Sequence, residues 1–121
     1  MSVFEYAVLR AVPRVQRGEY VNVGVVLYCQ ERDFLHALAH IDEDRLRAID
    51  HDVDLAAVDE ALDAVCRTCE GEGPAGATSL GQRFRWLTAP RSTVLQAGPV
   101  HSGVTDDPAG QLRHLLDTLV R

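Results

Sequence analysis

Lysine is absent from this sequence, and several other reactive residue types are scarce. All twelve cationic residues of the 121-residue chain are arginine, and the chain holds three cysteines, one tryptophan and one methionine. Without lysine, the protein can form neither a Schiff base on a side-chain amine nor the lysine contact of a phosphate-binding loop. The cationic chemistry left to it is that of guanidinium, a planar fork that binds carboxylate or phosphate.

Long apolar runs are also lacking. No stretch approaches the length that crosses a membrane, and Met1 leads directly into strand-forming residues rather than into a leader sequence. We therefore expect no signal peptide, no membrane association and a cytoplasmic location. Hydrophobic residues make up 46% of the chain and charged residues 25%, which is typical of one globular domain over residues 1–121.

Positive charge is in deficit overall but is unevenly distributed. The formal net charge is -6, which argues against general affinity for nucleic acid. Residues 31–75 carry four arginines against thirteen acids, whereas residues 1–30 carry three against two and residues 76–121 carry five against three. The middle of the chain is therefore acidic, and a basic surface requires that the two ends meet in space.

The N-terminal third predicts a three-stranded β-meander over residues 3–41. Residues 3–12 and 19–30 are rich in β-branched and aromatic side chains and are joined by a short Arg/Gly segment, and residues 34–41 follow a polar turn. The second strand alternates in an informative way. One parity is wholly apolar and predicts the core face: Val21, Val23, Val25, Leu27 and Cys29. The other parity includes Tyr20, Asn22 and Gly24, so the question is what packs against that face.

The remainder of the chain predicts helices and one further strand. The middle, residues 42–88, contains a short polar helix over 42–49, a helix capped by Asp54 and a helix over 80–88. Residues 93–101 predict a fourth strand, and Pro108 begins a leucine-striped helix within 93–120. The fold class is α+β, an antiparallel sheet of about four strands packed against three to four helices that cover one of its faces.

Two patterns suggest metal or redox chemistry, but the expected secondary structure argues against a reactive site in both. Cys66 and Cys69 have the C-x-x-C spacing, but both fall on the apolar stripe of their helix, where free cysteines are typically core residues. His36 and His40 would stand about 13 Å apart on a strand, too far for one ion. We therefore predict no metal site and no cofactor.

Catalytic candidates are weak. No nucleophile elbow frames a serine, and His101 and Ser102 are adjacent in a predicted strand, where neighbours point to opposite faces. His101 is the one candidate for a general acid or base. The arginines are more suggestive, because they are either solvated surface residues or ligands for an anion or an acidic partner. The candidate binding residues are Arg10, Arg14, Arg17, Glu19, Asn22, Gly24, Arg91, Ser92 and His101.

Two segments carry a resemblance to a known family. "YAVLRAVPRVQRGEYVNVGVVLYC" (6–29) and "RFRWLTAPRSTVLQAGPVHSGVTDDP" (83–108), with the leucine-rich last helix, make the chain similar to DUF3037, an uncharacterised bacterial family. The resemblance implies no reaction. It implies an accessory role beside kinase-like proteins of the toxin-antitoxin type. The positions that match the family pattern are Arg10, Pro13, Arg14, Gly18, Glu19, Asn22, Gly24, Arg91, Ser92, His101, Gly103 and Pro108.

Three functions remain open. The first is a non-catalytic interaction or accessory domain that binds a protein partner through a polar face around Arg10, Arg14, Glu19 and Asn22. The second is an enzyme or binding protein for a phosphorylated or carboxylated small molecule, with Arg14, Arg17 and Arg91 as an anion clamp and His101 as general acid or base. It requires that Arg10, Arg91 and His101 converge on one pocket. The third is a nucleic-acid-binding module, which requires a continuous basic face with exposed Tyr20 or Trp86.

Overall fold

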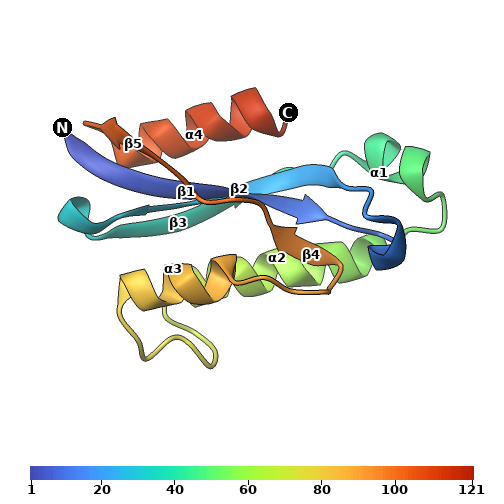
Figure 1. Ribbon diagram of the computed structural model, residues 1–121, viewed down its shortest axis with the longest axis horizontal. Helices are drawn as coiled ribbons and strands as arrows, with labels where there is room; N and C mark the ends of the chain where they lie inside the picture. The colour runs from blue at the N-terminus through green and yellow to red at the C-terminus, as the bar shows by residue number, and fades with distance from the viewer.

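A long hairpin forms the centre of the computed structural model, which describes all residues 1–121 (Figure 1). Strand β1 (Ser2–Ala11) pairs antiparallel with β2 (Val21–Cys29). The connection contains a single 3₁₀ turn, η1 (Val15–Arg17), which ends at Gly18 with a φ of 71°. Glycine suits that left-handed conformation because it has no Cβ to clash with the backbone.

The sheet has five strands in total. Strand β3 (Phe34–Ala39) follows a second 3₁₀ turn, η2 (Gln30–Arg32), and pairs with the outer side of β2. Strands β4 (Leu95–Ala97) and β5 (His101–Thr105) both pair with the other side of β1, one at each end of it. The two ends of the chain therefore meet in the sheet. The α+β fold class is confirmed.

The single strand predicted over residues 93–101 is in fact two short strands with a break. Gly98 N–H donates to the Val8 carbonyl, and His101 then pairs with Tyr6. From Gly98 to His101 the edge advances by three residues, whereas the facing segment of β1, from Val8 to Tyr6, advances by two. One residue of the edge therefore has no partner in β1. Pro99 lies in this break and has no N–H to donate. Residues 102–105, which we did not predict as strand, complete the edge.

Each of the four helices begins after a polar capping residue, as the sequence predicts for Asp54. They are α1 (Glu43–Ile49), α2 (Leu55–Cys69), α3 (Leu80–Thr88) and α4 (Pro108–Leu119). In each case the side chain of the residue before the helix accepts a hydrogen bond from a backbone N–H in the first turn. The capping residues are Asp42, Asp54, Ser79 and Asp107.

The helices cover both faces of the sheet, and the prediction that they cover one face is wrong (Figure 1). Helix α4 packs on one face over Phe4, Val25 and Leu27. Helices α2 and α3 pack on the other face in a larger core that includes Leu9 and Phe84. The apolar residues of both parities in β2 therefore have a helix to pack against.

A β-bulge explains why the simple alternation in β2 misassigns its faces. Leu9 pairs with Gly24, but Arg10 pairs with Asn22, so Val23 is an extra residue between them. Beyond such a residue the side-chain alternation reverses. Val23 accordingly lies in the core beneath α2 and α3, whereas Val25 lies in the core beneath α4.

No helix has the length and apolar character needed to span a bilayer.

Candidate functional site

Asn22 and Gly24 make internal contacts. Nδ2 of Asn22 donates to the carbonyl of Leu119 at 3.0 Å, which ties β2 to the end of α4. A Cβ on Gly24 would lie 2.8 Å from the Leu38 carbonyl oxygen, so the glycine permits close approach of β3. Both positions of β2 are therefore occupied by contacts within the protein, Asn22 with the end of α4 and Gly24 with the backbone of β3.

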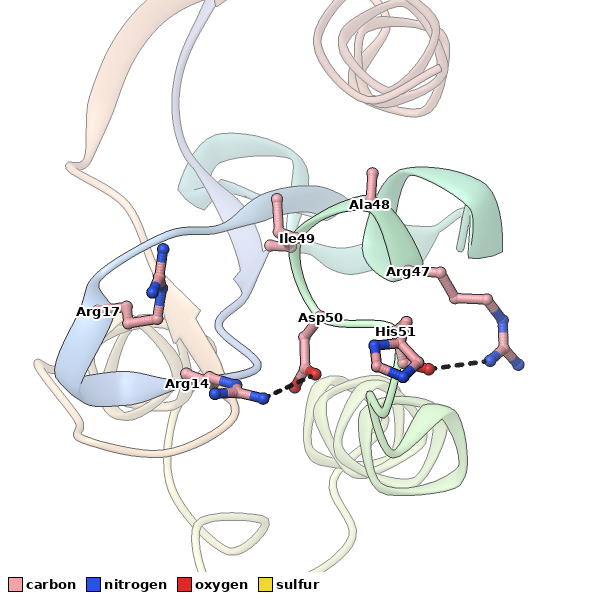
Figure 2. Close-up of a pocket in the computed structure, with 7 residues that line it drawn as sticks. All are labelled: Arg14, Arg17, Arg47, Ala48, Ile49, Asp50 and His51. Carbon is pink, nitrogen blue, oxygen red and sulfur yellow. Dashed lines mark hydrogen bonds and ion pairs between the residues drawn. The ribbon is translucent and has the colours of Figure 1, made fainter.

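A cavity of about 310 Å³ lies between the β1–β2 connection and α1 (Figure 2). Arg14 donates to Asp50 at 3.4 Å across it, and Arg47 donates to the His51 carbonyl at 3.4 Å. Arg17, the third arginine of its wall, is paired with Glu19 at 2.5 Å. Arg14 and Arg17, two of the three predicted clamp arginines, are thus already paired with carboxylates, and Arg91 does not line this cavity.

The carboxylates that pair with Arg14 and Arg17 have pKa values below their ordinary ones. Burial opposes the ionisation of Asp50, but hydrogen bonds from Arg14 and from the Asp52 backbone hold the pKa of Asp50 below its ordinary value. The hydrogen bond from Arg17 lowers the pKa of Glu19. Both carboxylates are therefore charged at neutral pH, and they offset the positive charge of this cavity.

A second cavity, of about 400 Å³, lies at the sheet edge beside the break between β4 and β5. We call it the edge cleft, and no acidic residue lines it. Arg10 comes from β1 and Arg91 from the segment after α3, so residues far apart in sequence form one wall. Its lining includes Arg10, Thr88, Arg91, Gln96, Gly98 and Val100.

Arg10 is held in place by packing rather than by a carboxylate. Its Cζ lies 4.2 Å from the centroid of the Tyr20 ring, in cation–π contact. A Cβ on Gly98 would lie 3.0 Å from the same Cζ, so the guanidinium occupies the space that this glycine leaves open. The Nε atom is buried and has no hydrogen-bond acceptor. Arg10 is thus held against the sheet edge without a carboxylate partner.

Arg91 is held in a similar way. Its Cζ lies 5.2 Å from the centroid of the Trp86 ring, and its Nη2 donates to the Trp86 carbonyl. No ion pair in the structure includes Arg10 or Arg91. Two guanidinium groups, each on an aromatic ring, thus border one cavity without a compensating acid.

His101 and Ser92 lie outside the edge cleft. The His101 ring packs on Tyr6, with 5.3 Å between the ring centroids, and Ser92 is exposed between α3 and β4. The structure thus brings Arg10 and Arg91 together but leaves His101 apart from them. Sequence reasoning missed Thr88, Gln96 and Gly98 as lining residues. The Gly98–Pro99 pair within the predicted strand was the available signal, because such a pair interrupts a β-ladder.

The cysteines do not form a reactive pair. Cys69 is buried in the core, as the apolar stripe predicts, and Cys66 is half-buried. Burial, with the nearby Cys66 and Glu70, raises the pKa of Cys69 to about 12, and burial also raises the pKa of Cys66. Both thiols are protonated at neutral pH, so neither is an activated nucleophile. No cluster of three or more histidine, cysteine or acidic side chains is placed to hold a metal ion.

Residues 6–120 match the model of a family described as protein of unknown function (DUF3037). The chain belongs to this family. No curated protein and no solved structure matches the chain. Both segments that carry the sequence resemblance contribute to the edge cleft, the first through Arg10 and the second through Arg91 and Gly98.

Proposed function

We propose that the chain is a non-catalytic interaction module of the bacterial cytoplasm that binds a protein partner around the edge cleft. Tyr20 and Trp86 are 47% and 50% exposed, and Val100 at the rim is 43% exposed. With Arg10 and Arg91 they form what we call the edge surface. Tyrosine, tryptophan and arginine are the residue types that dominate binding energy at protein interfaces.

This proposal modifies the surface expected from sequence. Of the four residues named for it, Arg14 and Glu19 are paired with Asp50 and Arg17, and Asn22 is bound to α4. Arg10 alone has no acidic or carbonyl partner. The proposed contact surface accordingly moves from the hairpin connection toward β4 and the end of α3.

The observation that carries the proposal is the pair of unneutralised, aromatic-stacked arginines at one cavity. Burying them against an apolar partner would leave two charges unpaired, which is costly. The matching partner surface is therefore acidic. The kinase-like class implied by the family resemblance is the first to test.

The test is purification of the tagged chain from its source bacterium, with Trp86→Ala as the variant and Val104→Ala as the control. The Val104 side chain is similarly exposed, at 54%, but it lies on β5 and does not line the edge cleft. We expect one partner to be retained by wild type and Val104→Ala and to be depleted with Trp86→Ala. A clean monomer from all three preparations, or equal recovery with both variants, would contradict the proposal.

A binding protein for a phosphorylated or carboxylated small molecule is the second candidate, because a cavity of about 400 Å³ suits a small ligand. An enzymatic version of this candidate needs an acid or base at the cavity, and His101 does not line it. Nucleic-acid binding has less support, since most of the N-terminal arginines are paired with carboxylates. Binding of a single-stranded oligonucleotide that weakens steeply with salt would favour that third function.

A further inference from the structure

The edge cleft is electrostatically unlike the cavity between the β1–β2 connection and α1. In the cavity of Figure 2, Arg14 faces Asp50, whereas Arg10 and Arg91 share a wall that contains no acid. A concave site with walls of one charge concentrates the potential inside it. The edge cleft is therefore complementary to an anion that carries more than one negative charge.

Arg10 is also fixed in position before any ligand arrives. Its guanidinium lies against both the Tyr20 ring and the backbone of Gly98. A side chain that is already ordered loses little further entropy on binding. This ordering favours an oxyanion ligand at the outer end of the guanidinium.

We propose that the edge cleft binds a phosphate monoester. Resting on the proposed function above, we assign that group to a phosphorylated side chain of the protein partner. A phosphate monoester carries close to two negative charges at neutral pH and offers three acceptor oxygens, which suits two guanidinium groups. A carboxylate or a phosphodiester carries one charge and leaves one arginine uncompensated.

Trp86 provides a built-in reporter of this binding. It is the only tryptophan of the chain, it is half exposed, and Arg91 lies over its ring. Movement of the Arg91 guanidinium toward an anion changes the environment of the indole. We would titrate the purified chain with O-phosphoserine and, separately, with acetate at constant ionic strength. The expected result is a saturable change in Trp86 emission with O-phosphoserine at concentrations well below those at which acetate acts.

Three variants decide whether the response comes from the edge cleft. Arg10→Met retains most of the side-chain packing but removes the charge, and we expect it to weaken O-phosphoserine binding about tenfold or more. Arg91→Met should weaken it similarly, with isotope-edited NMR replacing fluorescence because this variant alters the reporter. Arg113→Met, an exposed residue on α4, is the control and should bind as wild type does. No saturable response in wild type, or equal affinity in wild type and Arg10→Met, would overturn the proposal.

A peptide in which phosphoserine is flanked by acidic residues tests which molecule carries the phosphate group. Tighter binding of this peptide than of O-phosphoserine supports a partner protein as the carrier. Binding of O-phosphoserine with no gain from the peptide supports the site but assigns it to a free phosphorylated molecule. Because these titrations need no partner, they can succeed where the co-purification fails, so the two proposals fail separately.

Discussion

The guanidinium of Arg10 occupies the space that a side chain on Gly98 would fill. A Cβ at position 98 would lie 3.0 Å from Cζ of Arg10 and 3.1 Å from its Nε. The glycine that interrupts the edge strand thus also makes room for the arginine of the cleft. The break in the strand and the binding residue are two parts of one local structure.

Substitution of this glycine should impair binding without unfolding the protein. Gly98→Ala pushes on the end of a flexible side chain, so we expect the free energy of unfolding to fall by less than about 1 kcal/mol. Arg10 leaves its place on Tyr20, and affinity for O-phosphoserine or for the partner falls several-fold. Urea unfolding and the Trp86 titration measure the two effects. Unchanged affinity would show that Arg10 need not be held there.

An alanine at Gly24 should instead lower stability and leave ligand affinity unchanged. Here the nearest atom to a new Cβ is the backbone oxygen of Leu38, at 2.8 Å, and a strand within a sheet cannot move aside without cost. We expect Gly24→Ala to lower the free energy of unfolding by about 1–3 kcal/mol. Ligand affinity of the folded fraction stays as in wild type. A stability equal to that of Gly98→Ala would contradict this account of the β2–β3 contact.

Asn22 should stabilise the attachment of α4 rather than bind a ligand. Asn22→Ala removes the Nδ2 hydrogen bond and leaves the Leu119 carbonyl without that donor. We expect a loss of about 1–2 kcal/mol in the free energy of unfolding. Hydrogen exchange at the C-terminal end of α4 should accelerate, while affinity at the edge cleft remains unchanged. A variant of wild-type stability with weakened partner binding would instead return Asn22 to the binding surface.

The buried thiols predict a loss of stability at alkaline pH. The pKa of Cys69 is raised to about 12 in the folded protein, whereas an unfolded thiol ionises near about 8.5. Above the unfolded value the unfolded chain loses a proton that the folded chain retains, so stability falls as the pH rises toward 12. Cys69→Val should show a shallower decline than wild type in urea unfolding across that range. Parallel declines would mean that Cys69 ionises normally when folded.

The sequence predicts most of the elements because their signals are local. Asp54 and Pro108 mark helix starts that the structure reproduces, and the strand at 34–39 falls within the predicted 34–41. The faces of β2 could not be assigned in the same way, because the bulge at Val23 is defined by the partner strand. The alternation of apolar and polar residues within one strand gives no sign of such a shift.

The candidate site was predictable only in part, for a related reason. Arg10 and Arg91 stand out as charges in otherwise apolar or turn-forming segments, so residue type alone made both of them candidates. Their meeting depends on β4 pairing with β1 across more than eighty residues of chain, which no local pattern specifies. The pairing of Arg14 with Asp50 is equally non-local. It removes from the site a residue that looks identical to Arg10 in the sequence.

Site-specific photo-crosslinking in the source bacterium tests the central claim, partner binding at the edge surface, most directly. A photoreactive residue would replace Val100 in one strain and Val104 in another, since both side chains are exposed, at 43% and 54%, and only Val100 lines the edge cleft. We predict that position 100 crosslinks to one protein partner and that Arg10→Met, introduced in the same chain, abolishes the crosslink. Crosslinks to a partner from position 104 and none from position 100 would contradict the account.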